Sequence, residues 1–315
     1  MVIVGNIFLY LLSLITIWFG SGLVIDSINK FAKRLRLSPF VISFVILGLL
    51  TSIPEAAVGI TSVLDGQPEI FVGNLLGGKM VIFLFIIPIL AILGNGVRIN
   101  HNLDSKKLLS LLFIGAIPAL FAIDRNLTNF EGLIMVGLYV LVIFYIKNNQ
   151  VTETQQENLT SIKMYSVMDL LKVAFGTGLV LVSSQIIVNE TIYFAEVFKI
   201  PAFYISLLVL SLGTNLPELS IASRSILSGN KDIALGNYLG SSTAHTLLFG
   251  VFTIMNNNQE ISGNGLLATL IFIVVGLGTF YYFSKSKNDI SKKEGFILLS
   301  IYLIFVIYQI KTGFI

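Results

Sequence analysis

Cysteine and charge are what this sequence has least of. None of its 315 residues is a cysteine, so disulfide bridges, thiolate metal sites and cysteine nucleophiles are excluded. Charged residues make up only 12% of the chain, whereas 55% is hydrophobic and the mean hydropathy is +0.88. A soluble domain needs far more polar surface than this. The composition therefore indicates an integral membrane protein.

Long apolar runs recur along the chain with few charges inside them. Each run has about 18 residues or more, which is long enough for a helix to cross a bilayer. The first run continues through Gly20 and Ser21 into a basic segment without a small-residue cleavage motif, so we interpret it as a retained helix and not as a signal peptide. The sequence predicts an all-α membrane protein with ten spans, at 3–25, 39–64, 69–94, 107–124, 130–146, 166–189, 201–227, 233–255, 264–283 and 295–311.

The basic residues predict the orientation of these spans. Lysine and arginine in short loops stay on the cytoplasmic side of a membrane. With ten spans, sixteen basic residues fall in loops or toward span ends on one side, and only Arg125, Lys199 and Lys311 on the other. The twentieth, Lys79, falls inside the third span. We therefore expect both termini to be extracytoplasmic and the polar segment 148–165 to be a cytoplasmic connector.

The chain repeats itself at an offset of 163 residues. The motif LTSIPE, ending at Glu55, returns as GTNLPE, ending at Glu218, and GNLLG from Gly73 returns as GNYLG from Gly236. Each half holds five spans, an odd number, so the second half enters the membrane from the opposite face. The sequence thus predicts two inverted five-helix repeats. We expect the repeats at 1–147 and 166–315, with the shared motif regions at 43–90 and 206–253.

Two carboxylates in mid-span are the main candidates for a cation site. Glu55 and Glu218 each follow a proline, which lacks an amide hydrogen and leaves the carbonyl four residues earlier without its helical partner. Carbonyl, hydroxyl and carboxylate oxygens are hard ligands that suit calcium or sodium far better than a transition metal. Two carboxylates would also neutralise one divalent cation. The expected ligands in these motifs are Leu50, Thr51, Glu55, Gly213, Thr214 and Glu218. The alternative is a proline kink whose glutamate pairs with Lys79.

The Gly-Asn-x-x-Gly motifs place further polar groups on the third and eighth spans. Positions spaced i, i+4 and i+8 share one stripe of a helix. The second-half stripe is Asn237, Ser241 and His245, and the first-half stripe is Asn74, Gly78 and Ile82. Lys79 lies one residue to the side, and its long stem could carry the ammonium into the site. We predict that Lys79 points into the central cavity beside Glu55 or Glu218, while His245 is either a coupling group or a satisfied core histidine.

At these residues the chain resembles the cation/calcium exchanger superfamily, of the prokaryotic sodium/calcium exchanger type. The motifs TSIPE and GNLLGG in the first half, with GTNLPE and GNYLGSS in the second, resemble that family's alpha repeats, and the likeness extends over the whole chain. The resemblance implies ten helices in two inverted repeats and a location in a prokaryotic inner membrane. It implies calcium binding by Glu55 and Glu218, with Thr51, Thr214, Asn74 and Asn237 around them. Ser52 and Asn215 stand where the family usually has a serine.

Several positions depart from the family pattern. Gly78 replaces a serine, Lys79 a small neutral residue, Ile82 a polar residue, and His245 an aspartate or asparagine. Sodium-ligating oxygens are thus missing and basic groups are added. Three interpretations follow: exchange of calcium or a related cation against sodium, exchange against protons with Lys79 and His245 in place of the sodium sites, or a non-transporting relative with a locked lysine–glutamate pair.

Other classes of function find little support in the sequence. An intramembrane enzyme using His245 or Lys79 as a base would need a nucleophile with a convincing partner, and Ser241 is better explained as a pathway residue. No nucleotide-binding glycine loop or nucleic-acid surface is present in the sequence. We expect a secondary active transporter without a tightly bound cofactor, whose partners are the bilayer and inorganic cations: Ca²⁺ and either Na⁺ or H⁺. The sequence does not determine the oligomeric state.

Overall fold

The structure of the protein is a computed structural model, which describes most of the chain. The described residues are 2–32, 39–94, 96–98, 105–148, 167–219, 223, 231–258, 260–261, 265–287 and 289–313. Apart from Asn148, the expected connector 148–165 lies outside them, as do 220–222 and 224–230 within the second motif region.

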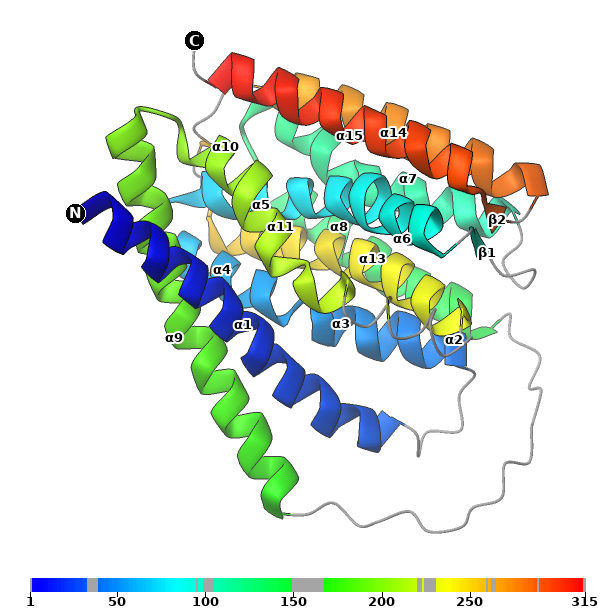
Figure 1. Ribbon diagram of the computed structural model, residues 1–315, viewed down its shortest axis with the longest axis horizontal. Coiled ribbons are helices and arrows are strands. Elements are labelled where there is room, and N and C mark those ends of the chain that lie inside the picture. The colour runs from blue at the N-terminus through cyan, green and yellow to red at the C-terminus, as the bar shows by residue number, and fades with distance from the viewer. Residues whose placement is uncertain are drawn as a thin grey trace.

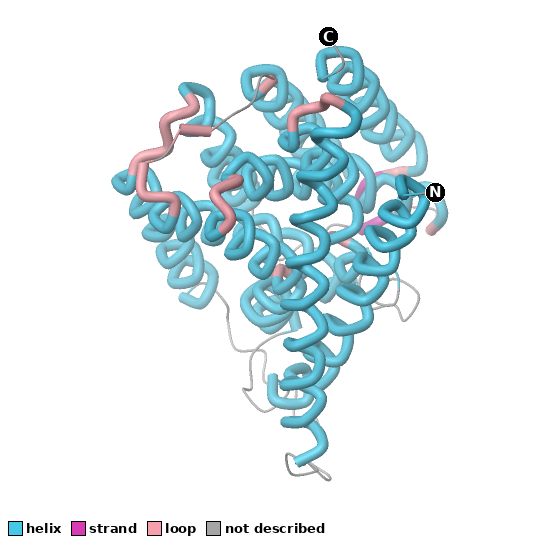
Figure 2. Tube along the Cα trace, turned by 90° about the vertical axis from the view of Figure 1, so that its left-hand side faces the viewer, coloured by secondary structure: helices cyan, strands magenta, loops and turns pink. Residues whose placement is uncertain are grey.

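Helices make up nearly all of the described chain, as the composition predicts (Figures 1 and 2). Helical segments lie at each of the ten predicted positions. The first half comprises α1 (Val2–Ala32), α2 (Pro39–Val41), η2 (Ile42–Leu47), α3 (Gly48–Thr51), α4 (Ile53–Leu64), α5 (Pro68–Val81), η3 (Ile82–Ile86), α6 (Ile87–Leu93), α7 (Ser105–Phe121), η4 (Ala122–Asp124) and α8 (Asn129–Asn148). The second half comprises α9 (Val167–Phe198), α10 (Ala202–Ile205), η5 (Ser206–Leu210), α11 (Ser211–Thr214), α13 (Lys231–Met255), α14 (Leu266–Lys287) and α15 (Lys292–Gly313).

Fewer of these segments pass a strict test of length and apolarity than the ten spans predicted. Among the described residues, eight helices are long and apolar enough to cross a membrane, or nine if Ser43–Thr51 and Ile53–Leu64 count as one bent span. The helix left over is α13, whose middle reads GNYLGSSTAH. These polar residues are buried inside the protein and do not face lipid. A span that lines a polar site can therefore be too polar for such a test and still be a membrane-spanning helix of the bundle.

The helices form a central group flanked by outer ones (Figure 1). The long pair α1 and α9 packs together along one side, and α14 and α15 lie on the other. The central helix α5 and its π-helical extension η3 are buried almost throughout, whereas the outer helices expose large apolar side chains such as Phe8, Phe175 and Ile304. This distribution suits outer helices in contact with lipid tails.

The same irregularity occurs at equivalent places in the two repeats. The π-helical segments η2 and η5 each lead into a short helix that ends at a residue with near-zero ψ, Ser52 (φ −83°, ψ 9°) and Asn215 (φ −88°, ψ 10°). The prolines Pro54 and Pro217 follow two residues later. In the first half the helix axis bends by 46° at this break. Because proline cannot donate an amide hydrogen bond, the sequence places the break directly before each buried glutamate.

Glycines allow the broken spans to approach the central helices closely. A Cβ on Gly77 of α5 would overlap the carbonyl of Leu207 in η5, and a Cβ on Gly240 of α13 would overlap the carbonyl of Phe44 in η2. Both the glycines and their contacts differ by 163 residues. Small residues permit this packing in membrane proteins, where helices associate through close van der Waals contact. The predicted repeat is therefore also a repeat of three-dimensional contacts.

Two loop contacts agree with the predicted sorting of loops between the membrane faces. Strand β1 (Val97–Arg98) pairs antiparallel with β2 (Asp289–Ile290), and this pairing joins two loops assigned to the basic side. The pair is the one non-helical element within the described part of the chain. At the other face, the amide of Ile261 donates to the carbonyl of Arg125 over 3.0 Å. The start of α1 and the end of α15 lie at the end of the molecule away from the strand pair (Figure 1). Which end faces the cytoplasm stays a prediction.

Candidate cation-binding site between the repeats

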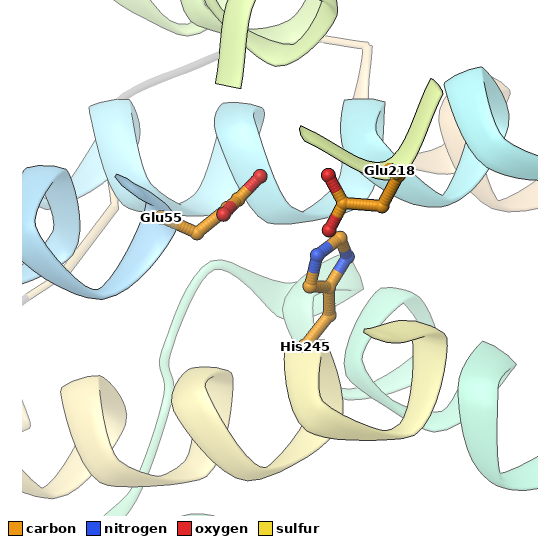
Figure 3. A group of neighbouring side chains, drawn as sticks. All are labelled: Glu55, Glu218 and His245. Atoms are coloured by element: carbon orange, nitrogen blue, oxygen red, sulfur yellow. The ribbon is translucent and has the colours of Figure 1, made fainter. Parts of the chain in front are cut away.

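The two predicted glutamates meet in the centre of the protein. Glu55 lies in the first turn of α4, and Glu218 lies in the helical residues that follow Asn215. Both side chains are fully buried. One carboxylate oxygen of each and a ring nitrogen of His245, on α13, all lie within 4.8 Å of one another (Figure 3). The two carboxylates therefore lie close together, as expected, and their binding of one shared cation stays a prediction.

The polar atoms at this centre have no hydrogen-bond partners within the described protein. This holds for all four carboxylate oxygens of Glu55 and Glu218 and for both ring nitrogens of His245. A buried carboxylate without a partner costs several kcal/mol if ionised. The arrangement therefore suits a positively charged ligand that satisfies several of these atoms at once.

Threonine and asparagine side chains cross between the repeats beside the carboxylates. The Thr214 hydroxyl donates to Asn74 Oδ1 over 3.0 Å. The equivalent Thr51 hydroxyl lies 3.4 Å from Asn237 Oδ1, and its nearer acceptor is the Leu47 carbonyl at 3.0 Å. Thr51 Oγ1 also lies 2.8 Å from Ser241 Oγ. All five side chains are buried. Each repeat thus contributes a threonine from its broken span and an asparagine from its central helix.

The predicted ligands Ser52 and Asn215 differ in what they offer. The Ser52 hydroxyl donates to the Gly48 carbonyl in its own helix over 2.8 Å. The Asn215 amide nitrogen likewise donates to the Ser211 carbonyl, but its Oδ1 atom is buried without a partner. Asn215 therefore offers a free amide oxygen, and Ser52 offers a hydroxyl oxygen that keeps two lone pairs while its proton is donated to Gly48.

The carbonyls of Leu50 and Gly213, predicted to be freed by the prolines, find local partners. The backbone amide of Ser52 donates to the Leu50 carbonyl, and the backbone amide of Asn215 donates to the Gly213 carbonyl. Each of these carbonyls therefore accepts a hydrogen bond from the residue at the helix break. A carbonyl oxygen has two lone pairs, so a ligand role for Leu50 and Gly213 stays a prediction.

Lys79 does not lie where its sequence position predicts. Its ammonium donates to the Gly115 carbonyl of α7 over 2.5 Å and to the Thr246 hydroxyl of α13 over 3.0 Å. Neither glutamate accepts a hydrogen bond from it. Successive residues of a helix point about 100° apart, so Lys79 is directed away from the stripe that carries Asn74 and Gly78. The expected position beside Glu55 or Glu218 is wrong, and so is the locked lysine–glutamate pair.

His245 is directed into the centre because Gly78 leaves room for it. A Cβ on Gly78 would lie 2.8 Å from Cε1 of the His245 ring and 2.9 Å from Nδ2 of Asn215. The position equivalent to Gly78 is Ser241, whose hydroxyl contacts Thr51. Ile82, the third first-half stripe position, is buried in the apolar core and offers no ligand.

Sequence reasoning missed two groups that hold Lys79. Thr246 directly follows His245 and could have been considered as a polar neighbour on the same helix. Gly115 takes part through its backbone carbonyl, which every residue possesses, so no sequence signal marks it. The fold that these groups complete is that of a helical membrane protein with a buried cluster of two carboxylates and one imidazole between two related halves.

Comparison with known proteins gives the family. The model of the sodium/calcium exchanger protein family matches residues 5–147 and again residues 169–311. The chain therefore belongs to the sodium/calcium exchanger family, a family of transporters and not of enzymes, and the match to each half confirms the repeat.

Individual relatives agree over most of the chain. A putative antiporter, CaxA of Alkalimonas amylolytica, is 29% identical over 263 residues, covering 80% of this chain and 81% of the relative. The inner membrane protein YrbG of Escherichia coli K12 is 23% identical, covering 74% of each chain. The solved structure of the sodium-calcium exchanger NCX_Mj soaked with Na⁺ and Sr²⁺ superimposes with a TM-score of 0.69 at 22% identity, covering 98% of this chain and 99% of that one. The last likeness concerns the fold.

Proposed function

We propose that this protein is an antiporter that exchanges calcium or a related divalent cation against sodium or protons by alternating access. The observation that carries the proposal is the meeting of Glu55 and Glu218 between two equivalent halves, both fully buried and without hydrogen-bond partners among the described residues. Two carboxylates balance the charge of one divalent cation. The names of the relatives, a putative antiporter and a sodium-calcium exchanger, support the same activity.

The inverted repeat supplies the means of alternating access. In such repeats the two halves can exchange conformations around a fixed central site, which opens it to one side and then to the other. The threonine–asparagine pairs on either side of the glutamates are formed between repeats, so a movement of one half against the other would change them together. We expect these pairs to be part of the site in both open states.

The counter-ion is either sodium or the proton. Threonine, asparagine and serine oxygens beside the carboxylates favour sodium. Protons are the second candidate, because Gly78 and Ile82 supply no side-chain oxygen and a histidine occupies the neighbouring space. We place the protein in a prokaryotic inner membrane with both termini extracytoplasmic, as the basic loops and the inner membrane relative suggest.

The test is flux into vesicles that contain the purified protein. Radioactive calcium is supplied outside, and an outward sodium gradient and an outward proton gradient are imposed in separate experiments. We expect calcium, or a related divalent cation supplied in its place, to accumulate with one of them. The E55Q and E218Q variants should each abolish the uptake, whereas E196Q, which changes an exposed glutamate on α9, should leave it intact. Equal uptake by wild type and both site variants would rule out the proposal.

A further inference from the structure

His245 brings a nitrogen atom into a site whose other expected ligands are all oxygen atoms. The imidazole is fully buried, and one ring nitrogen lies within 4.8 Å of a carboxylate oxygen of Glu55 and of Glu218. Figure 3 shows the ring directed at the Glu218 carboxylate. The three side chains come from α4, from the helical residues after Asn215 and from α13, so both repeats contribute.

A structural role in the core does not account for this ring. A neutral imidazole has one donor and one acceptor nitrogen, and buried polar atoms in proteins are nearly always hydrogen-bonded. Both nitrogens of His245 lack a partner among the described residues. The neighbouring hydroxyls are engaged elsewhere, since Thr246 Oγ1 donates to the Ile114 carbonyl and Ser241 Oγ contacts Thr51. The ring therefore presents a free nitrogen to the two carboxylates.

We infer that the divalent cation bound by Glu55 and Glu218 is a first-row transition-metal ion of the series from Mn²⁺ to Zn²⁺, with His245 as its nitrogen ligand. This inference rests on the proposed function, because it names the class of cation carried at the same site. Two carboxylates and one imidazole make a mixed oxygen and nitrogen set. Imidazole is a common ligand of zinc, iron and nickel, whereas calcium takes oxygen ligands almost exclusively.

Gly78 is the residue that makes this ligand set possible. Its missing side chain leaves the space that the His245 ring fills, and a Cβ there would lie 2.8 Å from ring atom Cε1. The symmetry-equivalent Ser241 keeps its side chain and contacts Thr51. The two repeats are thus unequal where the imidazole enters, and the pair Gly78 and His245 acts as one specificity determinant.

Pulsed electron paramagnetic resonance of bound Mn²⁺ tests the inference directly. The full-length protein, carrying no histidine tag, is loaded with one equivalent of MnCl₂ in detergent. We expect modulation from an imidazole ¹⁴N nucleus in the wild type and its loss in H245D. The chain has one other histidine, His101, which lies outside the described residues. The H101N variant is the matched control and should keep the signal.

Calorimetric titration with ZnCl₂, MnCl₂ and CaCl₂ gives the second measurement. Changes outside the first ligand shell commonly alter metal affinity by about 10- to 100-fold, so loss of a direct ligand should lower the Zn²⁺ to Ca²⁺ affinity ratio of H245D by at least as much. Calcium binding retained by H245D would show that this variant is folded.

The outcomes separate the inference from the function on which it rests. Mn²⁺ bound without an imidazole signal, or an unchanged affinity ratio in H245D, overturns the nitrogen ligand while E55Q and E218Q still abolish binding. Divalent binding that survives in E55Q and E218Q overturns the glutamate site itself. Should H245D not fold, the wild-type spectrum and the H101N control decide the question alone.

Discussion

At the scale of single residues, the absence of a side chain at Gly78 determines what the site contains. Gly78→Ala would place a Cβ 2.8 Å from His245 Cε1 and 2.9 Å from Asn215 Nδ2. Both neighbours are side-chain atoms that can move by rotation, so we expect the protein to fold and the ring to shift. Affinity for Mn²⁺ should fall about 10-fold or more, by analogy with other changes that reorient metal ligands.

Calorimetry on purified protein measures this effect, and α8 offers a control. Gly137→Ala adds the same atom where nothing lies within 4 Å, so it should leave Mn²⁺ affinity unchanged. An unaltered affinity in Gly78→Ala would show that the position of the imidazole does not influence binding.

Residues of the site differ in how well the sequence predicts them. The repeat offset of 163 residues predicts the meeting of Glu55 and Glu218, because symmetry puts equivalent residues at equal depth. The same logic fails for Lys79, which has no basic counterpart at Ser242 in the second repeat. Its partner is a backbone carbonyl on α7, so no side-chain pattern could reveal it. The direction of one side chain from a helix depends on packing that a motif does not encode.

At the scale of helices, Lys79 joins three elements. Its ammonium on α5 donates to Gly115 of α7 and to Thr246 of α13. Lys79→Met removes both hydrogen bonds and leaves the buried Gly115 carbonyl without this donor. We expect the free energy of unfolding in detergent to fall by about 1–3 kcal/mol, the usual cost of leaving a buried polar group unsatisfied.

Denaturant titration followed by circular dichroism measures this loss. Lys106 is exposed on α7, the helix that carries Gly115, so Lys106→Met should leave the free energy of unfolding unchanged. Equal stability of Lys79→Met and the wild type would indicate that the three-helix junction does not depend on the lysine.

The glycine contacts between broken and central spans make a second prediction at this scale. Gly240→Ala would force a Cβ into the backbone carbonyl of Phe44, and backbone cannot move aside by rotating a side chain. We expect destabilisation of about 1–3 kcal/mol or more, as for other overpacked interiors. Gly278→Ala on α14, where nothing lies within 4 Å, should be tolerated. Thermal unfolding of the two variants measures this difference. Equal midpoint temperatures for Gly240→Ala and Gly278→Ala would contradict the close contact between Gly240 and Phe44.

Elements also show where sequence patterns stop being informative. Apolar runs identify the outer helices well, but α13 is too polar to pass the same test because its polar residues surround the site. The π-helical segments η2, η3 and η5 have no composition that distinguishes them from ordinary helix. The breaks at Ser52 and Asn215 are predictable, since a proline follows each of them.

At the scale of the whole molecule, the prediction is the orientation in the membrane. The chain contains no cysteine, so single introduced cysteines report their own accessibility. Exposed Asn126 and Asn258 lie on the face predicted to be outside, and exposed Lys106 lies on the opposite face. In intact cells, a membrane-impermeant maleimide should label N126C and N258C but not K106C. The reverse pattern would invert the topology while leaving the fold unchanged.

The central claim is that Glu55 and Glu218 hold one divalent cation jointly, and equilibrium dialysis of the purified protein against a radioactive divalent cation tests it most directly. A shared site predicts one ion per chain in the wild type and none in E55Q, in E218Q or in the double variant at the same concentration. Each carboxylate is then necessary, since neither alone balances the charge. Two ions per wild-type chain, with one retained in each single variant, would contradict the claim and mean two separate sites.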